Sequence, residues 1–357
     1  MNIKALKFGA PLSIFILGYF SLTGHGWIIS TPLLYAFAFI PLVELIVRPT
    51  TENMSQAEEL VAKSDKLYDF WLYLIVPFQY LALYFFLTSI GDPTLTGLEL
   101  TGRILSMGLL CGTFGINVGH ELGHRKNLYE RNMAKALLLT SLYMHFYIEH
   151  NKGHHKNVST KEDPSSARRG ESIYLFYFRT VVMGFISAWG IAAEDQQKKG
   201  KPVIHYSNQM IQFQLVQLSL LGLILLIFGI KAMLCFMAAA TFGFLLLETV
   251  NYIEHYGLER VKTSSGQYER AMPAHSWNSN HILGRLMLFE LSRHSDHHYL
   301  ASRKYQILRH HDQAPQMPTG YPGMMILSLI PPLWFGIMHK RIHQFLQQNQ
   351  EILSAPK

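Results

Sequence analysis

The chain alternates long apolar runs with short polar links. Six of the runs approach the length of about 20 residues that an α-helix needs to cross a bilayer, namely residues 8–22, 27–47, 70–90, 98–118, 213–230 and 231–250. Short links at residues 23–26 and 229–231 join the first two runs and the last two runs into hairpins. The pattern therefore predicts an all-α integral membrane protein with six transmembrane helices.

Three further apolar stretches are predicted to stay on one side of the membrane. Residues 134–147 are too few for an easy crossing. Residues 173–193 are amphipathic to apolar, and we expect them to lie along the membrane interface. Residues 324–338 are interrupted by prolines, and we expect them to be interfacial as well.

The positions of the basic residues predict the orientation of the helices. Lysine and arginine concentrate near both ends of the chain and in residues 48–66, 125–135 and 156–201, whereas the link around Gly91 has only acidic side chains before Arg103. By the positive-inside rule, both termini are expected in the cytoplasm. The first apolar run has no cleavage signal and is predicted to be a retained anchor.

Composition supports a membrane protein and argues against several other classes. Hydrophobic residues make up 49% of the 357 residues and charged residues 15%, as in membrane proteins. The net charge of +7 comes without a basic stripe interleaved with aromatics, so we expect contact with membrane lipid or an acidic partner and no nucleic acid. Cys111 and Cys235 form no CxxC pair, so a disulfide framework and a zinc or iron–sulfur knuckle are excluded.

Half of the 18 histidines gather in four clusters next to predicted membrane helices. The clusters are HELGH (120–124), HNKGHH (150–155), the single histidine of NYIEHYGL (251–258) and HSDHH (294–298). The predicted topology brings all four clusters to the cytoplasmic side, so we expect one metal centre there.

Helical spacing predicts how the clusters divide their ligands. Residues four apart share a helix face, so His120 and His124 are predicted to bind one ion, and so are His150 and His154. His155 directly follows a partner, and it points about 100° away, toward a second ion.

His298 follows its own partner in the same way and is also predicted to face a second ion. Nine imidazoles exceed what one ion needs, which favours two ions. Imidazole binds zinc, copper, iron and nickel, so the ligand type alone does not name the metal. Four acids beside the clusters are expected to complete the coordination or to orient the ring N–H groups, namely Glu121, Glu149, Glu254 and Asp296.

The other nine histidines are predicted to have no ligand role. We expect His275 and His281 to pack near the site. His145, His205, His310 and His311 are expected in polar loops or at the interface, and the bilayer surface suits His25, His339 and His343.

Two other functional classes remain as alternatives. HELGH also matches the zinc-protease motif with a glutamate base, which would indicate an intramembrane zinc protease. Such a protease needs only one further ligand and leaves most of the histidines unexplained. A metal transporter or histidine-rich sensor would place its ligands inside the bilayer or in a flexible tract instead.

The motifs HELGH, EHNKGHH, NYIEHYGL and RHSDHH resemble those of the membrane-bound alkane monooxygenases, within the integral-membrane fatty-acid desaturase/hydroxylase superfamily. The resemblance runs from about residue 120 to residue 332. It includes residues 162–168, 275–281 and 318–323, and NYIEHYGL favours the hydroxylase branch over the desaturases.

The resemblance implies a single membrane-embedded domain over residues 1–357, with a cytoplasmic helical di-iron region whose clusters lie within residues 120–298. It implies two non-haem Fe ions that use O2 to hydroxylate the terminal methyl of medium- to long-chain n-alkanes. Electrons would come in trans from NAD(P)H through a reductase and rubredoxin. The implied catalytic iron ligands are His120, His124, His150, His154, His155, His255, His294, His297 and His298.

The resemblance leaves neighbouring reactions open. Oxidation of methyl-substituted aromatics such as xylene is the first alternative, and fatty-acid desaturation or hydroxylation is another. Asp296 is implied to orient a ligand without binding iron.

Overall fold

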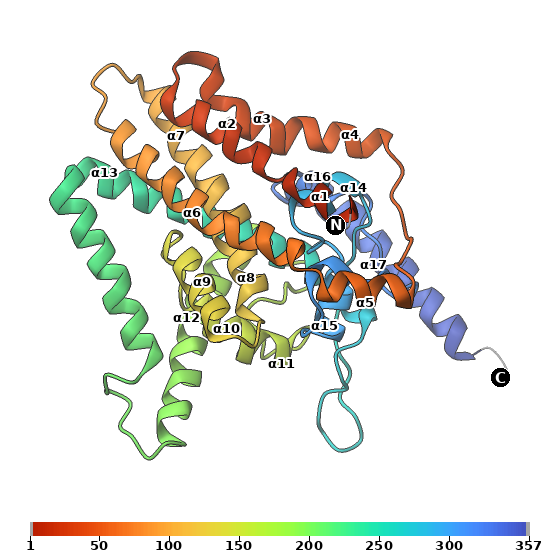
Figure 1. The fold of residues 1–357 in the computed structure, drawn as a ribbon. Coiled ribbons are helices and arrows are strands. Elements are labelled where there is room, and N and C mark those ends of the chain that lie inside the picture. Colours follow the sequence, from red (N-terminus) through yellow and green to blue (C-terminus); the bar gives the residue numbers. More distant parts are fainter. Residues whose placement is uncertain (1–2, 355–357) are drawn as a thin grey trace.

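The computed structural model describes residues 3–354, and their regular structure is helical apart from two isolated β-bridges (Figure 1). The all-α prediction is confirmed for these residues. The elements up to the first histidine cluster are α1 (Ile3–Leu6), η1 (Lys7–Gly9), α2 (Leu12–Thr23), η2 (Gly26–Ser30), α3 (Thr31–Leu34), η3 (Tyr35–Phe39), α4 (Ile40–Ile46), α5 (Gln56–Ser64), α6 (Lys66–Ser89), α7 (Gly97–Leu110), η4 (Cys111–Ile116) and α8 (Asn117–Gly123). Those that follow are α9 (Leu128–Leu139), α10 (Phe146–Glu149), η5 (His150–His154), α11 (His155–Asn157), α12 (Ile173–Gln197), α13 (Gln209–His255), η6 (Pro273–His275), α14 (Ile282–Met287), α15 (His294–Tyr299), η7 (Tyr305–Ile307), α16 (Tyr321–Ser328) and α17 (Pro331–Ser354).

Five helical stretches among the described residues are long and apolar enough to cross a membrane. They are Lys4–Thr23, Gly26–Ile46, α6, α12 and α13. The run at residues 98–118 is helical, as expected, but it is not one of the five. It contains the fully buried Arg103 and is divided into α7, the π-helical η4 and α8.

The structure changes the prediction for residues 173–193 and shows how the predicted hairpin at Gly229 is built. α12, expected along the interface, is 25 residues long and apolar enough to span. α13 is one stretch of 47 residues that bends at Gly229, where φ is 81° and ψ is 174°. Glycine adopts this backbone conformation without the steric penalty of a side chain. The predicted turn is therefore in the expected place, and the two arms of α13 diverge from it (Figure 1).

A capping box starts α7 and ties it to the first hairpin. The Thr96 hydroxyl accepts a hydrogen bond from the Glu99 N–H, and the Glu99 carboxylate accepts one from the Thr96 N–H at 2.9 Å. These bonds satisfy N–H groups that a helix start otherwise leaves unpaired. Glu99 also accepts the N–H of Gly26 at 2.8 Å, which fixes the link between α2 and η2.

Glycines let α7 and η4 approach the second arm of α13 closely. A Cβ atom at Gly108 would lie 2.7 Å from the carbonyl oxygen of Ala239, and one at Gly243 would lie 2.6 Å from the Cβ of Cys111. Small residues at a helix crossing allow such backbone contact in membrane proteins. α8, which follows η4, and the end of α13 both carry histidines of the clusters.

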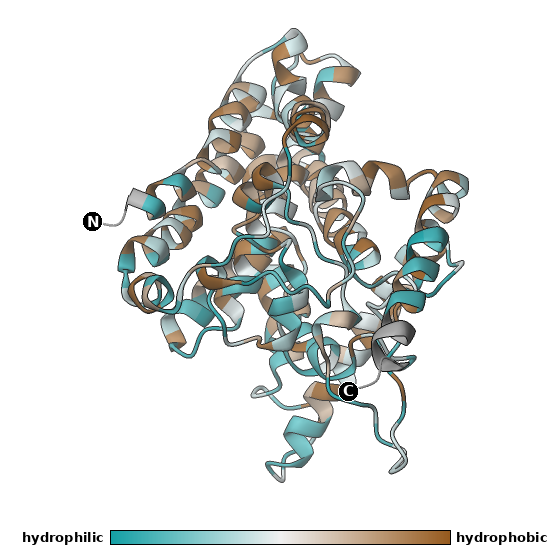
Figure 2. Ribbon diagram, turned by 90° about the vertical axis from the view of Figure 1, so that its right-hand side faces the viewer, coloured by the Kyte–Doolittle hydropathy of each residue, from teal (hydrophilic) through white to brown (hydrophobic). Residues whose placement is uncertain are grey.

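Short helices and loops surround the histidines and are here called the cap; they include α10, α11, α14 and α15. Apolar residues dominate the upper part of the molecule and hydrophilic residues its lower part (Figure 2). The apolar stretch at residues 324–338 is divided as expected, since α16 ends at Ser328 and α17 begins at Pro331.

Candidate metal centre

The nine histidines predicted as ligands converge in two groups. The side-chain nitrogens in each group lie within 4.8 Å of one another. The first group, here the five-histidine group, holds His120, His124, His150, His155 and His297. The second, the four-histidine group, holds His154, His255, His294 and His298. The prediction that these nine side chains meet in one place is confirmed.

The spacing of the nitrogens in the five-histidine group fits an ion between them. The Nε2 atoms of His120 and His297 lie 2.9 Å apart, those of His297 and His155 3.1 Å, and those of His155 and His150 3.0 Å. Two ligands about 2.1 Å from one ion are about 3 Å apart when the angle between them is 90°, and about 3.4 Å apart at the tetrahedral angle. The rings therefore already hold the distances that coordination requires.

Burial keeps these rings in the neutral form that binds metals. It lowers the pKa of His124 to about 3 and the pKa values of His120, His150, His155 and His297 well below the usual value of 6.5. A neutral imidazole has a free nitrogen lone pair, which an imidazolium lacks.

The four-histidine group shows the same convergence. The Nε2 atoms of His154 and His298 lie 3.2 Å apart, and so do those of His294 and His255. All four residues are buried, His154 and His255 completely.

A π-helix overturns the predicted pairing of His150 with His154. η5 is a π-helix over His150–His154, and its wider winding brings residues five apart closer to one face than an α-helix does. His150 therefore meets His155, and His154 turns to the four-histidine group. His155 lies in the other group from His154, and His298 in the other group from His297, as predicted, although His155 shares its group with His150.

Asp163 orients His154 and was missed by sequence reasoning. Its Oδ2 lies 2.9 Å from the Nδ1 of His154 and accepts the hydroxyl of Ser166. Burial lowers the pKa of His154, but the carboxylates of Asp163, Glu149 and Glu248 together outweigh burial, and the net pKa is raised. A carboxylate at the second ring nitrogen fixes the tautomer of a metal-binding histidine. The only signal in the sequence was the motif at residues 162–168, which contains no histidine.

The predicted role of Asp296 is wrong. Its oxygens accept hydrogen bonds from the Arg303 guanidinium at 2.8 Å, the Arg309 N–H at 2.9 Å and His311 at 2.7 Å. Asp296 faces away from the neighbouring ligands in α15 and anchors residues 303–311 to the cap.

Of the other three acids, Glu254 lies closest to the converging nitrogens. One of its oxygens is 3.1 Å from the Nε2 of His294, and the other accepts the hydroxyl of Tyr321 at 2.7 Å. Glu121 instead pairs with Arg125 at 2.8 Å. Glu149 is buried, and burial together with the Asp163 carboxylate raises its pKa to about 8.

The other histidines stay outside both groups, as predicted. His275 and His281 are buried and lie near Glu269 and Ser279, respectively. His145 was expected in a polar loop or at the interface, but it is buried, with its ring 5.3 Å from that of Phe185.

An apolar cavity of about 80 Å³ is lined by residues that come shortly before ligand histidines in the chain. Asn117 and Leu291 line it, three residues before His120 and His294. Its other walls come from α2, η3, α4, α7, η4, α13, α14 and α16.

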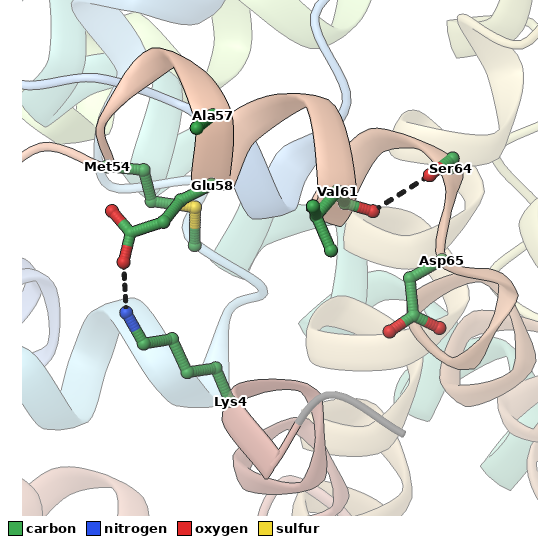
Figure 3. Close-up of a pocket in the computed structure, with 7 residues that line it drawn as sticks. All are labelled: Lys4, Met54, Ala57, Glu58, Val61, Ser64 and Asp65. Carbon is green, nitrogen blue, oxygen red and sulfur yellow. Dashed lines mark hydrogen bonds and ion pairs between the residues drawn. The ribbon is translucent and has the colours of Figure 1, made fainter.

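A larger hollow of about 680 Å³ lies elsewhere, between α1 and α5. Figure 3 shows Lys4 reaching across it to Glu58, and the two side chains form an ion pair of 2.6 Å. No histidine lines this hollow, so it is not part of the metal centre.

Comparison with known proteins agrees with the histidine motifs. Residues 100–328 match the family described as fatty acid desaturase. The chain is 40% identical to the alkane 1-monooxygenase of Ectopseudomonas oleovorans over 322 residues, which cover 90% of this chain and 80% of that protein. It is 39% identical to the alkane 1-monooxygenase of Pseudomonas putida, again over 322 residues, or 90% of this chain and 79% of that one.

A third relative is more distant. The hydroxylase component of the xylene/toluene monooxygenase of Pseudomonas putida is 32% identical over 243 residues, which cover 68% of this chain and 64% of that protein. The resemblance drawn from the motifs is therefore confirmed, and the chain belongs to the alkane 1-monooxygenases within the fatty acid desaturase family.

Proposed function

We propose that this protein is a non-haem di-iron monooxygenase that hydroxylates the terminal methyl of medium- to long-chain n-alkanes. The observation that supports it most is the convergence of nine imidazoles, seven of them buried, in two groups. Alkanes are proposed as the substrate in preference to xylene because the chain is more similar to the two alkane 1-monooxygenases than to the xylene/toluene enzyme.

Each histidine group would hold one iron. The five-histidine group supplies five nitrogens, and the four-histidine group supplies four, with the Glu254 carboxylate beside His294. When bound, the irons would activate O2 with electrons that they receive from the electron donor. Asp163, by accepting the Nδ1–H of His154, would leave the Nε2 lone pair of that ring free to bind the iron.

The apolar cavity would select the carbon that reacts. An alkane offers no polar group to a hydrogen bond, so its binding energy comes from apolar burial, about 0.8 kcal/mol for each CH₂. Because Asn117 and Leu291 of the cavity wall are three residues before His120 and His294, a linear chain that enters end-on would present its methyl group to the histidines first. Positioning of this kind overrides the greater strength of the terminal C–H bonds.

The geometry argues against the protease alternative. A zinc protease uses the glutamate of HExxH as a general base toward a metal-bound water. Here Glu121 is engaged with Arg125 and the N–H of Tyr305. The histidines also gather at helix ends, not along a membrane passage, which disfavours a transporter.

Six membrane spans with a cytoplasmic catalytic region remain the proposed topology. Each arm of α13 on either side of Gly229 is at least 20 residues long, enough for about 30 Å. With the two N-terminal stretches, α6 and the α7–α8 rod, the two arms make six crossings. α12 would then lie against them at the cytoplasmic interface of a bacterial inner membrane.

An acidic rubredoxin, reduced by an NAD(P)H-dependent reductase, is the proposed electron donor in trans. Exposed basic side chains on the proposed cytoplasmic side would attract it, namely Lys126, Arg168, Arg169, Lys198 and Lys199. Turnover limited by rubredoxin should fall as salt screens the attraction. Turnover that is unchanged between low and high salt would contradict this docking.

Metal and product analysis tests the proposal as a whole. Purified protein is expected to contain about two irons per chain, as its two ligand groups require. With O2, rubredoxin and its reductase, octane should give mainly 1-octanol, and xylene should be a poor substrate. One zinc with little iron, or preferred oxidation of xylene, would refute it.

A further inference from the structure

A buried carboxyl group lies beside the apolar cavity, outside the metal centre. Glu44 belongs to α4, near the end of the second candidate span, and is only 4% exposed. Ionisable side chains at such positions are costly, and they are retained where they have a function.

Glu44 joins the first hairpin to the catalytic cap. Its Oε1 accepts the N–H of Gly284, in the first turn of α14, at 2.7 Å. Its Oε2 has no hydrogen-bond partner among the described residues. The residues that it connects are 240 positions apart in the chain.

Two glycines make room for the carboxyl group. A Cβ atom at Gly320 would lie 1.9 Å from the Oε2 of Glu44, and one at Gly284 would lie 2.8 Å from its Oε1. Gly320 has a φ of −71°, which any residue adopts, so its backbone conformation does not require glycine. Glycine is required at position 320 because the Glu44 carboxyl group occupies the space of a side chain.

The three segments that meet at Glu44 also build one wall of the cavity. Ile40 lies one helical turn before Glu44, Gly284 donates to it, and Pro322 follows Gly320 by two residues; all three line the cavity. A shift of the carboxyl group would therefore move α4, α14 and α16 relative to one another.

We propose that Glu44 is a positioning residue that fixes this wall and thereby determines which carbon of the alkane reaches the irons. The inference rests on the proposed function. It adds a specificity determinant in a segment that contains none of the nine ligands.

Coupled substitutions test the inference. Glu44→Ala should leave the iron content unchanged but raise the share of 2- and 3-octanol about tenfold, within the effect of a misplacement of about 1 Å. Gly320→Ala should do the same by displacing the carboxyl group. Glu44→Gln should retain wild-type selectivity, because its amide oxygen still accepts the N–H of Gly284.

The double variant is the decisive measurement. In Glu44→Ala/Gly320→Ala the clash at position 320 is gone, so its product ratio and thermal stability should equal those of Glu44→Ala alone. Additive effects, or a Gly320→Ala protein with wild-type products, would overturn the inference. Gly336→Ala is the matched control, since a Cβ atom there would meet nothing within 4 Å.

A second readout separates this inference from the proposed function. Without reductant, the anaerobic protein in detergent should bind radiolabelled octane, and Glu44→Ala should weaken the binding several-fold. If wild type binds octane without oxidising it, the proposed function fails, whereas weaker octane binding by Glu44→Ala would still support the part of the inference that Glu44 fixes the cavity wall. Equal octane binding by wild type and Glu44→Ala would refute the inference.

Discussion

His150 and His155, five residues apart, bring their Nε2 atoms within 3.0 Å of each other, whereas His154, between them, faces the other histidine group. A π-turn produces this arrangement, because its wider winding brings residues i and i+5 closer to one face than an α-helix does. One short segment can therefore supply ligands to two ions.

The first prediction separates the two ions. His150→Ala should weaken iron binding in the five-histidine group and His154→Ala in the four-histidine group, each leaving about one iron per chain. Mössbauer spectra of the two variants should lack different components. His343→Ala, at an exposed position, is the control and should keep both irons. Loss of the same component in both variants would contradict the division.

The second prediction concerns Asp163. Asp163→Asn replaces the carboxylate that holds the ring of His154, so iron affinity of the four-histidine group should fall about 10- to 100-fold. Chelator titration measures the affinity. The neighbouring Glu162→Gln, an exposed position, should have no effect. An unchanged affinity in Asp163→Asn would show that another group orients His154.

The third prediction concerns the glycine crossing of η4 with α13. Gly243→Ala places a methyl group 2.6 Å from the Cβ of Cys111 and should lower the free energy of unfolding by about 1–3 kcal/mol. Gly222→Ala, in the other arm of α13, meets nothing within 4 Å and is the control. Thermal unfolding in detergent compares them, and equal midpoints would mean that the crossing relaxes at no cost.

The fourth prediction is a pH dependence from His145. Burial lowers its pKa to about 4 in the folded protein, against about 6.5 when unfolded. The unfolded chain thus binds the extra proton between these values, so this residue removes stability as pH falls from 6.5 to 4, by about 3 kcal/mol in total. His145→Phe should lose this part of the acid sensitivity. Identical pH profiles of thermal unfolding for both proteins would exclude the effect.

The sequence predicted where the chain bends and which histidines meet. Gly229 marked the turn in α13, and the spacing of the clusters against the apolar runs brought the nine imidazoles together. Their division between two ions was not predictable, since the pattern HNKGHH is compatible with either α or π winding.

Side-chain direction was the other missing information. Asp296 lies between ligands in the sequence but points to Arg303, whereas Asp163 is nine residues from His154 and touches it. Only the folded loop shows which carboxylate reaches a ring. The burial of Arg103 also depends on side-chain direction, because its guanidinium donates hydrogen bonds to the carbonyls of Ser89 and Gly24.

Residues 150–155 and 294–298 each contribute to both histidine groups. This sharing determines when, during synthesis of the chain, the two groups can become complete. While the ribosome is still synthesising the chain before α15, both groups lack members, although most of the apolar helices have already been translated. On the proposed ligand assignment, neither iron has its full set of ligands until synthesis has passed residue 298. Iron insertion is then a late step of biogenesis that takes place on helices already in the bilayer, and a nascent chain released earlier would have no complete site to fill.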